Sequence, residues 1–126
     1  MYIVGTIDIN IYKYITEDIV TDEVIITDKQ LLHIQEKHPE AYQDAIGFIN
    51  GILQEPDYII KDDKHENTGL IVKRISVGEY SILIALKLCT SQDIEGYKNS
   101  VITSWKISER RLNNYLRNKK ILYKKE

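Results

Sequence analysis

The stretch LIVKRISVGEYSILIALKL, residues 70–88, decides the fold. It contains two runs rich in isoleucine, leucine and valine, and Gly78-Glu79 separates them. A two-residue loop that begins with glycine is typical of a type II′ turn between antiparallel strands. The stretch therefore predicts a β-hairpin whose strands cover Leu70–Val77 and Tyr80–Leu88.

This turn also predicts which residues of the two strands face each other, because the loop sets the register. Val77 is expected opposite Tyr80, and every second residue then lies on the same face. One predicted face is mainly apolar and is the better core face: Ile71, Lys73, Ile75, Val77, Tyr80, Ile82, Ile84 and Leu86. The other face ends in polar groups: Leu70, Val72, Arg74, Ser76, Ser81, Leu83, Ala85 and Lys87.

Two helices are predicted before the hairpin. Thr27 and Gln30 have the spacing of a capping box, which indicates the start of a helix. This helix must end near Lys37, because the next residue, His38, precedes Pro39 and the α conformation is disfavoured before proline. Pro39 is then a suitable first residue for a second helix, which apolar residues at helical spacing continue.

Strand patterns occur on both sides of these elements. Short strands are predicted at Val24–Ile26, Tyr58–Lys61 and Ser100–Lys106. Ser108 is a suitable N-cap for a last helix, and residues 121–123 either continue that helix or add an edge strand. The order predicts an α+β domain, with N-terminal helices packed on a roughly four-stranded antiparallel meander and a C-terminal helix after it.

Length and composition fit one domain of 126 residues and 14.7 kDa. We assign residues 1–23 to a lead-in strand and linker, and residues 24–126 to the domain itself. One cysteine, Cys89, excludes an internal disulfide and fits a reducing compartment. The N-terminus lacks the pattern of a signal peptide and no apolar run reaches the length of a membrane span, so we expect a cytoplasmic protein without a membrane partner.

The charge is unevenly distributed along the chain, although its net value is only −2. Residues 106–126 hold eight of the 17 Lys and Arg and two of the 19 Asp and Glu, a charge of +6 that leaves −8 for residues 1–105. A basic end on an acidic body fits a surface that faces phosphates. It fits equally well a solvated terminal helix whose lysines keep the protein in solution.

His38 is the first candidate for chemistry, because the elbow between two helices makes its ring reachable. A histidine titrates near neutral pH and is the usual general acid or base. The alternative is that His38 only caps the elbow. His33 lies five residues earlier and is expected on a different side of the helix, as a partner of His38 or at the edge of the core.

Lys87 is the second candidate, since it follows an apolar strand. It either extends its ammonium to the end of the sheet or stabilises a negative phosphoryl group. In the predicted register Arg74 lies on the same face, about four positions away. Strict alternation in the late strand separates Ser100 from Thr103, but a bulge would change which side chains share a face. No ligand spacing for a metal and no phosphate-binding loop is present, so neither metal nor cofactor is expected.

The runs IITDKQLLHIQEKHPEAY, EPDYII, NTGLIVKRI, GEYSILIALKL and GYKNSVITSWKISERRL resemble the phage-associated nucleases of the barnase–EndoU–colicin–RelE-like superfamily. The resemblance extends from about Val24 to about Tyr123, and HIQEKHPE and GYKNSVITSWK are its most specific parts. It implies helices packed on a four-stranded antiparallel sheet and a metal-independent ribonuclease, often a toxin.

By this resemblance, His38 matches the family histidine before proline, Lys87 the strand lysine, and Ser100 and Thr103 the late strand with its hydroxyls. These four are the predicted catalytic residues. His33 matches a less certain upstream histidine. The residues predicted to bind substrate are His33, Arg74, Asn99, Arg110 and Arg111.

The implied reaction is attack of the RNA 2′-hydroxyl on its own phosphate, which leaves a 2′,3′-cyclic phosphate. RNA is the implied partner, together with an immunity protein or another phage protein. One alternative is a catalytically inactive module of phage or mobile-element origin that binds nucleic acid or protein. Another is a phage structural or packaging accessory that mainly contacts protein.

Overall fold

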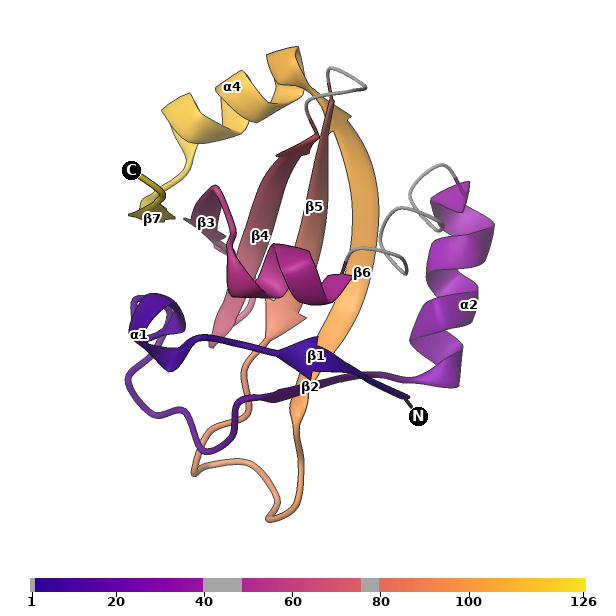
Figure 1. Ribbon diagram of the computed structural model, residues 1–126, viewed down its shortest axis with the longest axis vertical. Coiled ribbons are helices and arrows are strands. Elements are labelled where there is room, and N and C mark those ends of the chain that lie inside the picture. The colour runs from indigo at the N-terminus through magenta and orange to yellow at the C-terminus, as the bar shows by residue number, and fades with distance from the viewer. Residues whose placement is uncertain (1, 40–48, 76–79) are drawn as a thin grey trace.

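The computed structural model describes residues 2–39, 49–75 and 80–126 and confirms the α+β class. A seven-stranded sheet runs through the molecule in the order β1-β2-β6-β5-β4-β3-β7 (Figure 1). Its strands are β1 (Tyr2–Thr6), β2 (Glu23–Ile26), β3 (Tyr58–Lys61), β4 (Thr68–Ile75), β5 (Tyr80–Lys87), β6 (Asn99–Ser108) and β7 (Ile121–Lys124). The helices are α1 (Ile9–Tyr12), α2 (Asp28–Lys37) and α4 (Glu109–Asn118), and residues 49–54 are also helical.

The four central strands, β3 to β6, form the predicted antiparallel meander. The predicted number of strands is wrong, because the sheet continues at both edges. Residues 121–123 belong to the edge strand β7, which pairs with β3, while β2 pairs in parallel with β6 and carries β1 beyond it. The pairings of β3 with β7 and of β2 with β6 join segments that are far apart in the chain, and a local pattern shows a short strand without showing its partner.

Strands β4 and β5 form the predicted hairpin, but their register differs from the prediction. Ile75 pairs with Tyr80 and Lys73 with Ile82, whereas the predicted turn places Ile82 opposite Ile75. The turn itself, predicted at Gly78-Glu79, lies outside the described residues. Because the difference is two residues, the side chains of residues 70–75 and 80–87 stay on their predicted faces.

Both faces of the sheet are buried, not only the predicted core face. On the predicted core face, Ile82 and Ile84 pack with the helical residues 49–54, which cross in front of the central strands (Figure 1). On the other face, Leu83 packs with Leu112 of α4. Burial on both sides explains why these strands are almost continuously apolar. We refer below to the side that α4 covers in part as the α4 face.

Helix α2 begins and ends as predicted. The Gln30 N–H donates to Oγ1 of Thr27 at 3.1 Å, and the Thr27 N–H donates to Oε1 of Gln30 at 3.2 Å, which completes the capping box. His38 leaves the helix with φ −136° and ψ 56°. The helix lies beside β6 (Figure 1). Of the predicted second helix, residues 40–48 lie outside the described residues.

The residues before Val24 are packed on the domain. Strand β1 pairs with β2, and the side chain of Tyr12 is fully buried. Its phenol donates to the carbonyl of Leu53 at 2.9 Å, which ties α1 to the helical residues 49–54. Burial raises the pKa of Tyr12 far above its ordinary value, so this phenol remains a hydrogen-bond donor.

Replacing Tyr12 by phenylalanine is expected to lower the free energy of unfolding by about 1–3 kcal/mol, because the Leu53 carbonyl would stay buried without a donor. Urea unfolding followed by circular dichroism measures this. Tyr14→Phe is the matched control. Tyr14 is 54% exposed, so removal of its hydroxyl should change the free energy of unfolding by less than about 0.5 kcal/mol. Equal midpoints for both variants would contradict the expectation.

Candidate active site

His38 lies at the C-terminal end of α2, beside β6. Its imidazole is half-buried and is tilted by 33° against the indole of Trp105, with 5.7 Å between the ring centroids. The ring of His33 contacts it edge-on at 5.9 Å, so the prediction that the two histidines lie on different sides is wrong. That prediction assumed helical geometry, which the backbone has left at His38. Two imidazoles therefore lie side by side.

Lys87 and Ser100 face each other across β5 and β6 and line one cavity of about 410 Å³. Lys87 is exposed and Ser100 is half-buried. The hydroxyl of Ser100 donates to Oε1 of Gln30 at 3.1 Å, so the capping box of α2 also holds this strand residue. His38 does not line this cavity.

A β-bulge in β6 decides which of its side chains share a face. Ala85 pairs with Thr103 and Leu86 with Val101, which leaves Ile102 without a partner across the strands. Strict alternation would place Ser100 and Thr103 on opposite faces. The bulge brings both to the α4 face, together with Trp105.

The candidate residues follow one another along this face. Trp105, against which the His38 ring lies, pairs with Leu83, and Ser100 pairs with Lys87 four residues further along β5. At about 3.3 Å per residue, the two ends are roughly 13 Å apart. Thr103 lies midway, and its buried hydroxyl has no hydrogen-bond partner in the described part of the chain. His38 and Lys87 thus share a face without touching each other.

Two residues predicted to bind substrate are engaged within the protein. Asn99 is fully buried: its Oδ1 accepts from the Cys89 N–H at 2.8 Å, and its amide donates to the carbonyls of Thr21 and Glu23. These bonds hold β2 and the end of β5 against β6. They leave the side-chain amide no exposed surface for a substrate.

Arg74 lies further from Lys87 than predicted, because the true register pairs it with Ser81, six residues along β5 from Lys87. Its guanidinium donates to Oε1 of Glu109 at 3.0 Å and lies 5.3 Å from the ring centroid of Tyr58. Arg74 therefore binds the first residue of α4 and lies away from the Lys87 cavity.

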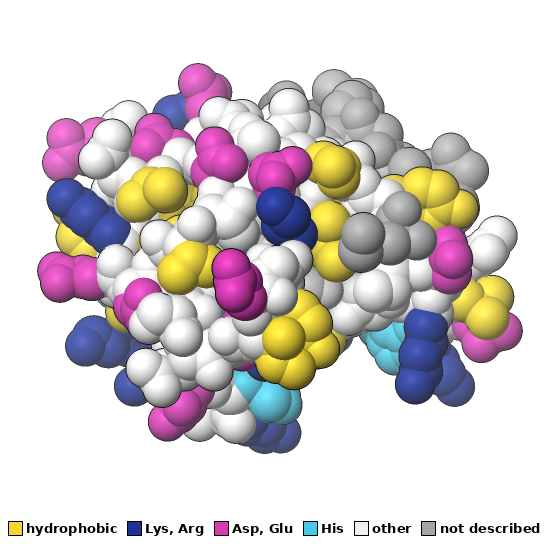
Figure 2. Space-filling view, turned by 90° about the horizontal axis from the view of Figure 1, so that it is seen from below, with side chains coloured by type: hydrophobic (Ala, Val, Ile, Leu, Met, Phe, Trp, Pro, Cys, Tyr) yellow, Lys and Arg dark blue, Asp and Glu magenta, His cyan; other side chains and the backbone are white. Residues whose placement is uncertain are grey.

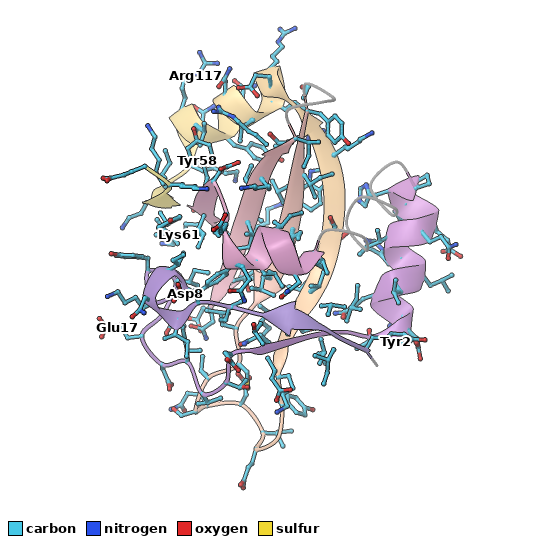
Figure 3. All side chains as sticks on the ribbon, in the orientation of Figure 1. Tyr2, Asp8, Glu17, Tyr58, Lys61 and Arg117 are labelled. Carbon is cyan, nitrogen blue, oxygen red and sulfur yellow. The ribbon has the colours of Figure 1, made fainter. Side chains whose placement is uncertain are left out.

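The basic segment forms α4 and β7. Arg110 and Arg111 are exposed in the first turn of α4, next to the end of β6 that is closer to Trp105 than to Ser100. Figure 3 shows Arg117 projecting from the same helix, away from the sheet. Part of the charge is neutralised, as by the 3.5 Å ion pair between Lys119 and Asp63. The exposed arginines place positive charge at one end of the row of candidate residues.

The sequence did not single out His65 as an acid or base. Its Nδ1 lies 3.2 Å from Oδ2 of Asp62, and it shares a cavity of about 480 Å³ with Lys87. Burial pushes the pKa of Asp62 up, but hydrogen bonds from Lys64 and His65 outweigh it and the pKa lies below its ordinary value. In the sequence, the Asp-x-x-His spacing in the turn-rich loop before β4 is the pattern that indicates this pair.

The described residues are 2–39, 49–75 and 80–126. No group of three or more His, Cys, Asp and Glu side chains there is arranged to hold a metal ion. No helix within these ranges is long and apolar enough to cross a membrane.

A family model described as phage-Barnase-EndoU-ColicinE5/D-RelE like nuclease 2 matches residues 3–124. The chain belongs to this family. The match includes most of β1 and all of α1, which precede the stretch that carries the resemblance in sequence. Searches of curated proteins and of solved structures found no match. Membership of this phage nuclease family confirms a nuclease-like domain and indicates a nucleic-acid substrate.

Proposed function

We propose that the chain is an endoribonuclease that cleaves RNA by attack of the 2′-hydroxyl, without a metal ion, and leaves a 2′,3′-cyclic phosphate. The observation that supports it best is the row formed by His38, Thr103 and Lys87 along the α4 face. An imidazole, a hydroxyl and an ammonium are the groups that this reaction needs around one phosphate.

In this proposal the scissile phosphate lies over Thr103, whose buried hydroxyl reaches the phosphate only after the side chains that cover it move aside on binding. His38 takes the proton from the 2′-oxygen as the O2′–P bond forms. The P–O5′ bond breaks, and the neighbouring imidazole of His33, protonated at the outset, gives its proton to the leaving 5′-oxygen, which departs as a 5′-hydroxyl. DNA lacks the 2′-hydroxyl and is therefore not a substrate.

Positive charge completes the proposed site. The ammonium of Lys87 approaches the phosphorane from the opposite end of the row, and Ser100 positions the strand through its bond to Gln30. Arg110 and Arg111 bind phosphates further along the strand, beyond His38. In this arrangement the positive charge of α4 attracts the RNA, although the rest of the chain is acidic.

The test is incubation of the purified protein with single-stranded RNA in the presence of EDTA. Cleavage to products with cyclic phosphate ends supports the proposal, and a substrate with one 2′-deoxyribose should resist cleavage at that position. Intact RNA, or cleavage that needs a divalent cation, would refute it.

The gap of roughly 13 Å between the His38 and Lys87 ends of the row favours a second candidate, a module that binds RNA without cleaving it. Such a module would show RNA affinity that falls steeply with salt and would release no product. Product analysis in the same titration separates the two functions.

Replacing Thr103 by valine should lower the cleavage rate about tenfold or more, since a hydroxyl that bonds a charged phosphate is lost. Stability should stay equal or rise, because the hydroxyl of Thr103 is buried and unpaired among the described residues. Ser104→Ala is the matched control: its hydroxyl is equally buried and unpaired in the described structure, but it lies on the other face, opposite Ile84. Rate assays and urea unfolding test both, and an equal loss of activity would contradict the role of Thr103.

A further inference from the structure

The cavity beside Lys87 has the form of a ligand site. It lies where β2, β5 and β6 meet the loop of residues 88–98, and its volume is about 410 Å³. Its apolar lining comes from Ile25, Leu88 and Cys89, which are at most 9% exposed. An apolar cavity of this size with a few polar groups at its edge is typical of a small-molecule site.

Tyr97 stands at the rim of this cavity and is 58% exposed. The loop that carries it is fixed near both ends. At one end the Thr90 N–H donates to Asp93 at 2.8 Å, and at the other Asn99 accepts from the Cys89 N–H. An exposed aromatic ring on a fixed loop is a stacking surface that loses little conformational freedom on binding. Figure 2 looks at this end of the molecule and shows hydrophobic side chains among charged ones.

The charges at the rim indicate what the cavity binds. Lys98 is neutralised by Glu23 at 2.7 Å, whereas Lys87 makes no ion pair within the described residues. The carboxylate of Asp93 also lines the cavity and accepts from the Thr90 N–H. An ammonium without an ion pair in the described structure, beside an apolar cavity and an exposed aromatic ring, matches a nucleotide, which has a flat base and an anionic phosphate.

We infer that this cavity holds one base of single-stranded RNA, stacked on Tyr97, next to the phosphate that Lys87 contacts. The inference rests on the proposed function, in which Lys87 meets the scissile phosphate. The base is that of the nucleotide on the side of the phosphate away from His38. Because every base has a π face, this site contributes affinity with little preference for base type.

The experiment uses a short 2′-O-methyl RNA, which binds but cannot react at its blocked 2′-oxygen, titrated into the full chain by fluorescence anisotropy. Tyr97→Ala should weaken binding about 5- to 100-fold, the usual effect of losing one base–aromatic stack. Tyr97→Phe should keep the affinity. Ile94→Ala is the matched control, since Ile94 is on the same loop, is 68% exposed and does not line the cavity.

Salt dependence separates stacking from charge. Tyr97→Ala should leave the slope of affinity against salt unchanged, whereas Lys87→Ala should reduce it by about one. Unchanged affinity in Tyr97→Ala, or an equal loss in Ile94→Ala or Tyr97→Phe, would overturn the base site. This RNA is not cleaved, so the expected affinities of the variants can be found even if the ribonuclease proposal fails. If the protein cleaves ordinary RNA but Tyr97→Ala binds the 2′-O-methyl RNA as well as the unchanged protein does, the base site alone is refuted.

Discussion

Replacing His38 by alanine is expected to lower kcat/KM for RNA cleavage by on the order of a hundred- to ten-thousand-fold, the contribution of one positioned acid or base. The imidazole is half-buried against Trp105 and in edge contact with His33. This packing fixes the orientation of the ring, and its half-buried position leaves part of the ring accessible to a substrate. The loss should appear in kcat, because the ring acts on the 2′-oxygen in the transition state.

Initial rates on a fluorogenic RNA oligonucleotide, measured with EDTA present, test this expectation. Thermal unfolding of the variant shows whether the protein is still folded. His65→Ala is an informative comparison, because His65 is held by Asp62 and shares a cavity with Lys87. If His65→Ala loses activity and His38→Ala does not, the acid–base group belongs to the loop before β4, and the role of His38 is refuted.

The parts of the fold that local chemistry determines were predictable from sequence. Thr27 and Gln30 form the predicted capping box, and Ser108 accepts from the Arg111 N–H at 3.2 Å as a helix cap. The hairpin was predicted with a register wrong by two residues. A shift of two keeps the side chains on their faces, so the prediction of which residues share a face is right although their partners and the burial of the second face are not predicted.

Features of the fold that depend on pairing between distant segments of the chain could not be predicted from the sequence. The parallel pairing of β2 with β6 joins Val24 to Asn99, and no pattern within either strand specifies it. For the same reason the sequence predicts Asn99 as a substrate ligand, although its amide donates to the carbonyls of Thr21 and Glu23. The predicted register likewise puts Arg74 too close to Lys87, because Arg74 pairs with Ser81.

The candidate site depends both on local sequence patterns and on strand geometry that the sequence does not indicate. The elbow at His38 follows from the proline after it, and the position of Lys87 follows from the length of the strand. The bulge at Ile102, which brings Ser100 and Thr103 to one face, has no glycine to signal it. The sequence therefore predicted the groups, and the structure shows their order along the sheet.

Replacing Lys87 by methionine is expected to lower the cleavage rate by about 10²- to 10³-fold, the usual loss when one donor to developing charge is removed. Methionine keeps most of the aliphatic stem, and Lys87 is exposed, so stability should change by less than about 0.5 kcal/mol. Lys98→Met is the matched control. It removes an equal charge from the same cavity, but Lys98 is already paired with Glu23.

Steady-state kinetics distinguish two roles for this ammonium. If Lys87 stabilises the phosphorane, kcat and kcat/KM fall together and KM stays constant. If it only attracts the RNA, KM rises and kcat is preserved, and the Lys98 variant should then show part of the same effect. A preserved kcat would remove Lys87 from the reaction and leave it as the phosphate contact beside the base site. Since the strand position of Trp105, against which His38 lies, is roughly 13 Å from that of Lys87, a fall in kcat in both single variants would mean that bound RNA brings both side chains to one phosphate.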